Sequence, residues 1–329
     1  MMRSEILALL RTAAESGDGY LSGEEIAKKL LVSRTAVWKH INELKIAGYE
    51  INSHSRRGYA LVEAPDLLLP NEIKNYLHTK LLGHNIKYYQ EVISTNNQAK
   101  ILAAEGAVDG TIVISEQQNG GRGRLSRGWF SPRSQGIWLS IILRPNFLPQ
   151  EAPKCTLLSA VALVKAIERV AKIKVGIKWP NDILYSGKKL AGILTEMNAE
   201  MDAINYIVIG MGVNVNIQDA DIPDELRDIM TSLCLLKGDK IDRVLLLCAI
   251  LEELEALYQI ALKEGFGTIL REWKKYSVTL GQEVRVMGFN NIFTGTAIDI
   301  DEAGALLVKL DDGSVKTVLA GDVSIRPKK

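Results

Sequence analysis

The sequence predicts a multidomain α+β protein in three parts: a helical unit ending in a hairpin (residues 1–64), a mixed α/β domain around one sheet (65–276) and a small β-barrel (277–329). The 329 residues exceed what one hydrophobic core usually serves, so several domains are expected. Pro65 and Pro70 bracket a short linker, after which the hydrophobic pattern changes. From Ser277 it changes again, to short alternating strands between glycines.

The composition excludes several classes of protein. With 47% hydrophobic and 24% charged residues, the chain is a globular protein and not a disordered segment, a collagen or a disulfide scaffold. The formal net charge is +1, so no overall field identifies a partner. The apolar run at residues 6–10 meets Arg11 too soon for a signal peptide or membrane helix, and we expect no membrane partner. Three widely spaced cysteines match no metal site and indicate buried thiols in a reducing cytoplasm: Cys155, Cys234 and Cys248.

Three helices are predicted in the N-terminal unit. The first starts with residues 6–10 and is interrupted at Gly17 and Gly19. Ser22 and Glu25 have the spacing of a capping box, which starts the second helix. Ser33 caps the third, which stops before a glycine at residue 48. The buried positions of the second and third helices are expected at Ile26, Ala27, Leu30, Val37, Ile41 and Leu44.

Positive charge is concentrated between residues 28 and 57, where seven cationic residues minus two acidic ones leave an excess of five. The tight turn within residues 22–41 is that of a helix-turn-helix, and residues 49–52 and 58–62 predict a β-ribbon. Such a unit reads DNA, although a solvated face on a helical adaptor is the alternative, and Trp38 could pack on a neighbouring domain. The expected DNA contacts are Arg34, Thr35, Trp38, Lys39 and Asn42 of the third helix, and Arg56 and Arg57 of the ribbon.

The middle of the chain alternates between two patterns, which predicts a mixed α/β domain. Strands are expected at residues 87–92, 111–115, 137–143 and 206–215, and helices at 152–170 and 241–263. The last helix places Val244, Leu247, Leu251, Leu254, Tyr258 and Ala261 on one face. The turns of the C-terminal barrel are expected at Gly288, Gly295, Gly304 and residues 312–313.

An arginine-rich loop is the most informative segment. Residues 117–150 contain five arginines and no acidic residue, and residues 120–129 read GGRGRLSRGW. Glycines let the backbone approach a ligand, and arginines supply forked donors for phosphate or carboxylate oxygens. The loop is no P-loop, and residues 210–214 lack the third glycine of a dinucleotide fingerprint. An RGG-type nucleic-acid segment is disfavoured because the loop lies between two predicted strands.

Two more motifs follow, KWPND at residues 178–182 and KKLAGILTE at 188–196. With them, the whole chain resembles the bifunctional biotin protein ligases that also act as biotin operon repressors. The resemblance implies a winged helix-turn-helix, a ligase domain with GRGRxxRxW, KWPND and KLAGIL, and an SH3-like barrel. It implies that biotin and ATP, with Mg²⁺, form biotinyl-5′-AMP and pyrophosphate, and that the biotinyl group passes to a lysine of a biotin carboxyl-carrier protein, as in acetyl-CoA carboxylase. It further implies a homodimer that represses biotin genes on operator DNA, with biotinyl-5′-AMP as corepressor.

The resemblance also implies roles for individual residues. Lys189 and Arg124 are the implied catalytic residues, with Lys189 near the biotin carboxylate and the α-phosphate. No built-in metal site is expected, but Asp182 is a candidate contact for the Mg²⁺ of ATP. Biotin contacts are implied at Ser94, Thr95, Asn96, Gln118, Arg122, Gly123, Arg124 and Lys189. Contacts to ATP or the adenylate are implied at Arg124, Arg127, Trp129, Lys178, Asn181, Asp182 and Asn214.

Simpler explanations stay open for several of these residues. Ser94 could be only a helix N-cap, Lys178 could pair with Asp182, and Asn214 could be a strand-end amide. Lys189 could be a surface lysine in a hairpin.

One departure from the family pattern is Ser134, which stands where the family's loop usually has glycine, while this chain has Gly136.

Two other functions also stay open. One is a transcription factor whose ligase-like domain only senses a small molecule, and the other is a lipoate ligase. The operator, the acceptor and the role of the C-terminal barrel are not specified by the sequence.

Overall fold

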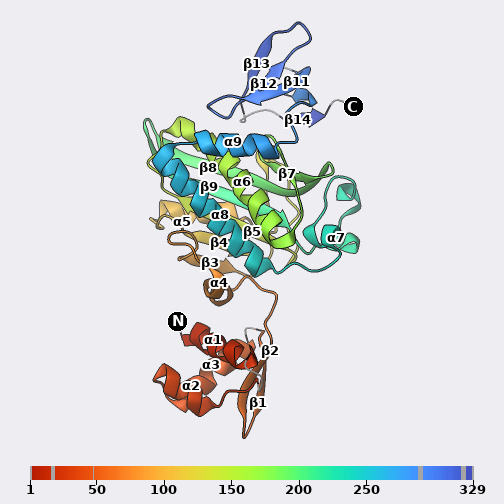
Figure 1. Ribbon diagram of the computed structural model, residues 1–329. Helices are drawn as coiled ribbons and strands as arrows, with labels where there is room; N and C mark the ends of the chain where they lie inside the picture. Colours follow the sequence, from red (N-terminus) through yellow and green to blue (C-terminus); the bar gives the residue numbers. More distant parts are fainter. Residues whose placement is uncertain (1, 16–18, 47, 288–291, 320–323, 328–329) are drawn as a thin grey trace. The chain divides into compact units, whose positions relative to one another are not determined.

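The computed structural model describes residues 2–15, 19–46, 48–287, 292–319 and 324–327. The chain forms two compact units, Met1–Tyr76 and Leu77–Lys329 (Figure 1). The predicted break at Gly17 and the predicted turn at Gly288 lie outside the described residues. Within the described part, no helix is both long and apolar enough to cross a membrane.

The first unit has the predicted three helices and hairpin: α1 (Met2–Glu15), α2 (Gly23–Leu30), α3 (Arg34–Ile46), β1 (Glu50–His54) and β2 (Gly58–Glu63). The capping box is confirmed, because Glu25 N donates to Ser22 Oγ at 3.1 Å and Ser22 N donates to Glu25 Oε2 at 3.0 Å. Ser33 Oγ accepts from Ala36 N at 3.1 Å and so caps α3. The predicted positions form one core with residues of α1, except that Leu30 is only half-buried.

A fourth helix, α4 (Pro70–Tyr76), belongs to this unit, whereas the sequence analysis placed a boundary at residue 64, a linker between Pro65 and Pro70, and the next domain after it. The Tyr49 hydroxyl and the Arg11 guanidinium both donate to the buried Glu72 carboxylate. Burial and the Glu72 charge raise the pKa of Tyr49, so its hydroxyl stays protonated as a donor. Ser4 Oγ also donates to Asn71 Oδ1 at 2.9 Å. These contacts explain why the unit extends to Tyr76.

The second unit is built on a seven-stranded sheet with the order β3-β4-β5-β9-β8-β7-β6. Its strands are β3 (Ile86–Tyr89), β4 (Ile112–Ser115), β5 (Gly136–Leu143), β6 (Gly176–Lys178), β7 (Asp182–Tyr185), β8 (Lys188–Glu200) and β9 (Ala203–Asn214). Only β3 and β4 pair in parallel among neighbouring strands of this sheet as described. The predicted strand at 87–92 is shorter than expected, because β3 ends at Tyr89 and only an isolated bridge joins Val92 to Gln118.

Helices cover the sheet, and the strands β4 and β5 are buried along their whole length. Figure 1 shows α6 (Ala152–Ala171) and α8 (Arg243–Glu264) side by side across it, as predicted for 152–170 and 241–263. The helix α5 (Thr95–Ala104) packs through Ala99 and Ala103 on Val113 and Ile142. All residues predicted on the buried face of α8 are buried, except that Val244 is half-buried. The remaining helices are α7 (Leu233–Lys237), α9 (Gly267–Tyr276) and the short 3-10 turns at Arg124–Ser126, Pro149–Glu151, Asp219–Asp221 and Asp224–Leu226.

The C-terminal part is a five-stranded antiparallel sheet of order β13-β12-β11-β10-β14. Its strands are β10 (Glu283–Met287), β11 (Ile292–Ile300), β12 (Leu306–Lys309), β13 (Val315–Val318) and β14 (Ser324–Pro327). It contacts the KWPND segment, since the buried Trp179 donates from Nε1 to Gly304 O at 3.1 Å and from its backbone N to Thr279 Oγ1 at 2.9 Å. The predicted α+β class with a small C-terminal β domain is confirmed, and the SH3-like barrel shape remains a prediction.

Candidate active site

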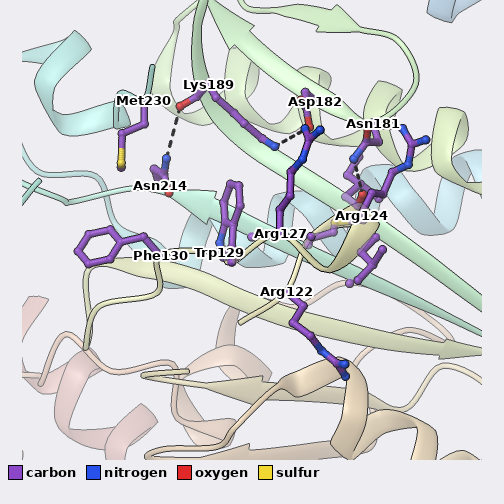
Figure 2. Close-up of a pocket in the computed structure, with 18 of the residues that line it drawn as sticks. Arg122, Arg124, Arg127, Trp129, Phe130, Asn181, Asp182, Lys189, Asn214 and Met230 are labelled. Atoms are coloured by element: carbon purple, nitrogen blue, oxygen red, sulfur yellow. Dashed lines mark hydrogen bonds and ion pairs between the residues drawn. The ribbon is translucent and has the colours of Figure 1, made fainter. Parts of the chain in front are cut away.

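A cavity of about 430 Å³ opens between the sheet and the arginine-rich loop (Figure 2). The loop runs from the end of β4 to the start of β5, as predicted. Every residue that the family resemblance implied for biotin or nucleotide lines this cavity: Ser94, Thr95, Asn96, Gln118, Arg122, Gly123, Arg124, Arg127, Trp129, Lys178, Asn181, Asp182, Lys189 and Asn214. Segments more than 100 residues apart in the chain thus meet at one site.

A buried polar network forms the end of the cavity at α5. Gln118 Oε1 accepts from Thr95 N at 2.8 Å and from Thr95 Oγ1 at 3.1 Å, so Gln118 caps the helix. The Ser94 side chain makes no capping hydrogen bond, which removes the simple N-cap explanation for that hydroxyl. Ser140 Oγ lies 2.6 Å from Asn96 Oδ1. This end therefore presents uncharged hydroxyl and amide groups to a ligand.

Asn96 is held in place from the far side by a carboxylate. Its Nδ2 donates to Glu196 Oε2 at 2.9 Å, and Lys100 Nζ donates to Glu196 Oε1 at 2.6 Å. Burial opposes ionisation of Glu196, but the hydrogen bonds from Lys100 and Asn96 outweigh it and hold the pKa of Glu196 below its ordinary value. Glu196 is thus an ionised anchor behind the polar network.

Two glycines of β9 allow ligand-facing side chains to approach the sheet. A Cβ at Gly210 would lie 2.1 Å from Asn96 Oδ1, and one at Gly212 would lie 2.2 Å from Trp129 Nε1. The Trp129 indole therefore rests on the strand where a side chain would otherwise stand. The sequence reasoning weighed these glycines only as a dinucleotide fingerprint and missed this role, although glycine inside a strand is a signal of close approach.

Lys189 lies at the centre of the site. Its Nζ is 2.7 Å from Asp182 Oδ1 and 5.0 Å from the centre of the Trp129 ring, and Figure 2 shows the three side chains converging. About a third of the lysine side chain is exposed, toward the cavity that it lines. Lys178 faces Asp182 across the β6–β7 pair, and Asp182 Oδ1 also forms the ion pair with Lys189. Lys189 is therefore more than a surface lysine of a hairpin.

The arginine-rich loop folds back on itself. Trp129 N donates to Gly121 O and Gly123 N donates to Arg127 O, both at 2.8 Å. Arg124 Nη1 donates to Asn181 Oδ1 at 3.2 Å. Arg122 instead points toward Asn97 and away from the other labelled side chains in Figure 2. The loop thus brings Arg124 and Arg127 to the cavity wall more directly than Arg122.

Ser134 adopts φ of 56°, in the left-handed region that glycine favours. The loop therefore has, at this position, a backbone conformation suited to the family's glycine despite the substitution. Gly136 has a separate reason to be glycine, because a Cβ there would lie 2.2 Å from the buried Trp138 ring.

Three buried polar atoms of the lining have no conventional hydrogen bond within the described chain; Asp182 Oδ1 is compensated by the Lys189 ammonium, whereas Asn214 Oδ1 and Trp129 Nε1 have no partner. Asn214 is fixed by its other end, since Nδ2 donates to Thr231 O at 3.0 Å. Buried polar atoms are nearly always paired in folded proteins. An unpaired acceptor and an unpaired donor in one cavity indicate a ligand with polar groups of its own.

Charge in the cavity is strongly biased. Arginines and lysines line it, and Asp182 is the one carboxylate among its described lining residues. The described chain contains no group of three or more His, Cys, Asp or Glu side chains placed to hold a metal ion. The site is therefore suited to hold a ligand with several negative charges.

A second hollow lies in the first unit, between α3 and the hairpin. It is lined by Arg34, Thr35, Trp38 and Arg56, among others. Trp38 is 58% exposed, Lys39 is exposed, and Asn42 is half-buried. The hairpin tip is ordered by His54 Nδ1, which accepts from the backbone N of Arg56 and of Arg57 at 3.2 Å each, and Arg57 lies over the Tyr20 ring. The predicted helix-turn-helix face and ribbon tip are thus largely exposed, with Asn42 the least accessible.

Known proteins match this chain over nearly its whole length. Residues 89–214 match the biotin/lipoate A/B protein ligase family, residues 279–326 the biotin protein ligase C-terminal domain, and residues 3–60 a helix-turn-helix domain. The bifunctional ligase/repressor BirA of Bacillus subtilis is 43% identical over 317 residues, which cover 96% of this chain and 97% of that protein. The chain belongs to this family of bifunctional ligase/repressors. The family member of Escherichia coli is 30% identical over 330 residues, 99% of each chain.

A solved structure agrees with the family assignment. The biotin protein ligase from Aquifex aeolicus, in complex with biotin and ATP, has a TM-score of 0.66 and 28% identity, and the match covers 74% of this chain and 100% of that one.

Within the family site, the sequence reasoning missed an apolar wall that includes Leu226, Ile229 and Met230. No motif marks that segment, which is held beside β8 by two backbone hydrogen bonds, from Lys189 N to Ile229 O at 2.8 Å and from Thr231 N to Lys189 O at 3.0 Å.

Proposed function

We propose that this chain is an ATP-dependent biotin protein ligase whose reaction intermediate also controls its binding to DNA. In the first step, a biotin carboxylate oxygen attacks the α-phosphate of ATP, which forms biotinyl-5′-AMP and releases pyrophosphate. In the second, a lysine amine of a biotin carboxyl-carrier protein attacks the acyl carbon and AMP leaves. The observation that carries the proposal is one cavity with an uncharged polar network at one end and clustered arginines and lysines beside it.

The polar end suits the ureido ring of biotin. This ring carries N–H donors and a carbonyl acceptor but no charge, so it needs hydroxyl and amide partners. Thr95, Asn96 and Gln118 offer such groups, already oriented by hydrogen bonds, and the Ser94 hydroxyl lies beside them in the lining. A preorganised polar pocket of this kind discriminates strongly against ligands that lack the matching groups.

The charged part suits the joining of two anions. Carboxylate and α-phosphate repel each other, so catalysis requires neutralisation and alignment, with no side-chain nucleophile. We assign Lys189 to the oxygens shared by the two reactants, and Arg124 and Arg127 to the phosphates. Arg122 and Gly123 would complete the loop when it closes over the biotin carboxylate. Release of Lys189 from Asp182 would accompany substrate entry.

The nucleotide base is assigned to the region of Trp129 and Asn214. The unpaired Asn214 Oδ1 can accept from an exocyclic amine such as that of adenine, and the indole offers a flat face. Lys178 and Asn181 line the same side of the cavity. The Mg²⁺ that accompanies ATP would neutralise phosphate charge, and Asp182 is the carboxylate that fits it, since such an ion needs only one or two carboxylates besides phosphates and waters.

The helix-turn-helix unit is assigned to operator DNA of biotin genes. Arg34, Thr35, Trp38, Lys39 and Asn42 would face the major groove, and the ribbon arginines would meet phosphates. We propose that biotinyl-5′-AMP favours a homodimer that presents two such units to two half-sites. The ligand can strengthen DNA binding only as far as it favours the dimer over the monomer. Because ATP, carrier proteins and DNA are all found in the cytoplasm, we propose that the protein acts there.

A transfer assay tests the ligase proposal. Purified full-length protein with ATP, Mg²⁺ and labelled biotin should transfer label to a carboxyl-carrier domain, and lipoate with a lipoyl domain should give none. Transfer of lipoate but not biotin would identify a lipoate ligase instead. Biotin-dependent DNA binding without any transfer would identify a transcription factor with a sensing domain only.

A further inference from the structure

A completely buried ion pair lies behind the arginine-rich loop, outside the cavity. Glu116 follows β4 and Arg243 begins α8, and Arg243 Nη1 lies 3.0 Å from Glu116 Oε2. The two side chains are 1% and 0% exposed. The same Nη1 donates to Gly136 O at 3.0 Å. Neither charged residue lines the active cavity.

Such a pair is an expensive way to stabilise a fold. Removing two charges from water costs several kcal/mol for each ion, and apolar replacements of similar volume are often as stable. A buried pair is therefore better explained by the geometry that it imposes than by a gain in stability. The question is which segments this pair joins.

Through this pair, both ends of the arginine-rich loop are bonded to the same guanidinium, that of Arg243. Glu116 immediately precedes the loop of residues 117–135, and Gly136 immediately follows it. Within the loop, Ser134 N donates back to Glu116 O at 2.9 Å. Gln118, two residues after Glu116, accepts from Thr95 N in the polar network. A shift at Glu116 would therefore move both the loop and the pocket residue Gln118.

The point to which the loop is tied is itself rigid. The Asn216 side chain makes two hydrogen bonds with the backbone of Ile241: its Nδ2 donates to Ile241 O at 2.9 Å, and its Oδ1 accepts from Ile241 N at 3.0 Å. Asp242 caps α8 by accepting from Leu245 N at 2.9 Å. Asn216 N in turn donates to Gln135 O, in the last residue of the loop, at 2.7 Å.

We propose that the Glu116–Arg243 pair positions the arginine-rich loop and Gln118 for adenylate formation. This inference rests on the proposed ligase function. Both are positioning residues, because neither faces the cavity. Loss of the pair should loosen the loop ends and displace Gln118 and Arg124 from the reactants, while the sheet and its helices remain folded.

The test compares two single variants, Glu116→Gln and Arg243→Lys, with Arg144→Lys as matched control. Arg144 is also an arginine bonded to backbone carbonyls, of Ala107, Asn205 and Ala103, but it follows the opposite end of β5. In biotin- and ATP-dependent pyrophosphate exchange, kcat/KM should fall at least tenfold for both single variants, mainly through a higher KM. The control should stay within about threefold of wild type, whatever its loss of stability.

A double variant separates positioning from folding. Glu116→Gln with Arg243→Met removes both buried charges, so its unfolding midpoint should recover toward that of wild type while kcat/KM stays low. Recovery of kcat/KM together with stability would overturn the proposal. If Glu116→Gln alone does not fold, Arg243→Lys, which keeps the positive charge but not the guanidinium contacts with Glu116 Oε2 and Gly136 O, and the double variant still decide the question.

Amide hydrogen exchange gives a readout that does not depend on activity. The protected amides of Gly123 and Trp129 should exchange at least tenfold faster in Glu116→Gln than in wild type, and at the wild-type rate in Arg144→Lys. Unchanged protection in the loop would refute the positioning role even if the protein proved to be no ligase. A different outcome would refute only the proposed function: the folded Glu116→Gln variant exchanges its loop amides faster, but the wild-type protein shows no adenylation activity.

Discussion

Replacement of Lys189 by alanine should abolish most adenylate formation and leave the fold almost intact. An ammonium about 4 Å from an anion, at an effective dielectric constant of about 20, contributes about 4 kcal/mol. If that interaction is made mainly in the transition state, its loss slows adenylation about 10³-fold. The lysine contacts Asp182 and Trp129 from the cavity wall, so its ammonium already lies beside the space that the reactants would enter.

The cost to stability is much smaller. The Lys189–Asp182 pair is partly exposed, at 33% and 21% for the two side chains, so solvent screening limits it to about 0.2–1 kcal/mol. The contact with the Trp129 ring adds about 0.5–1 kcal/mol. The melting temperature should therefore fall by only a few degrees, about 2–4 °C per kcal/mol for a unit of this size.

Pyrophosphate exchange with biotin and ATP measures the first step, and thermal unfolding measures the fold. The matched control is Lys188→Ala, the adjacent lysine, whose Nζ donates to Arg227 O at 2.9 Å and which does not line the cavity. The pyrophosphate-exchange rate of this control should stay within about twofold of the wild-type rate. A Lys189→Ala rate within about threefold of wild type would refute the electrostatic role assigned to this lysine.

Three further predictions follow from the structure. Arg34→Ala with Lys39→Ala should abolish operator binding in a gel-shift assay and leave biotin transfer unchanged; a parallel loss of transfer would contradict two separable activities. Gly212→Ala should raise the KM for ATP at least tenfold, because its Cβ would lie 2.2 Å from Trp129 Nε1 and must displace the indole, and an unaltered KM would argue against a nucleotide contact there. Glu196 should stabilise the fold fully above its ordinary pKa of 4.5, and this contribution should vanish as the pH falls through its lower folded pKa. The difference in unfolding free energy between wild type and Glu196→Gln should therefore shrink below pH 4.5, and a difference independent of pH would exclude the lowered pKa.

Local signals predicted most of the architecture. The capping box of Ser22 and Glu25 and the cap at Ser33 are recognisable from spacing alone, because their partners lie three residues away. The alternation of strands and helices likewise reflects periodicities that each element carries by itself. The site residues were located by whole motifs, and the fold then brought them to one cavity.

Longer-range features were not predictable in this way. Pro70 was interpreted as part of a linker, although proline is also common at the start of a helix, and only the contacts of Glu72 with Tyr49 and Arg11 reveal where α4 belongs. Ser134 departed from the family pattern in identity, but its φ of 56° lies in the region that glycine favours, which the residue name alone does not reveal. Arg122 was implied as a biotin contact, whereas its hydrogen bond to Asn97 directs it away from the other arginines in this state.

The indole of Trp179 has a consequence for anyone who recombines these proteins. Its Nε1 donates to Gly304 O, and its backbone N donates to Thr279 Oγ1, so the turn that carries Asn181 is held by two residues of the C-terminal part of the chain. A chimera that exchanges the C-terminal sheet between relatives must keep a carbonyl and a hydroxyl at these two places. Without them, Asn181 would be displaced in the wall of the cavity assigned to the nucleotide. The C-terminal sheet is thus not an interchangeable appendage, and a split-protein reporter cut near residue 277 should regain ligase activity only when its two fragments reassociate.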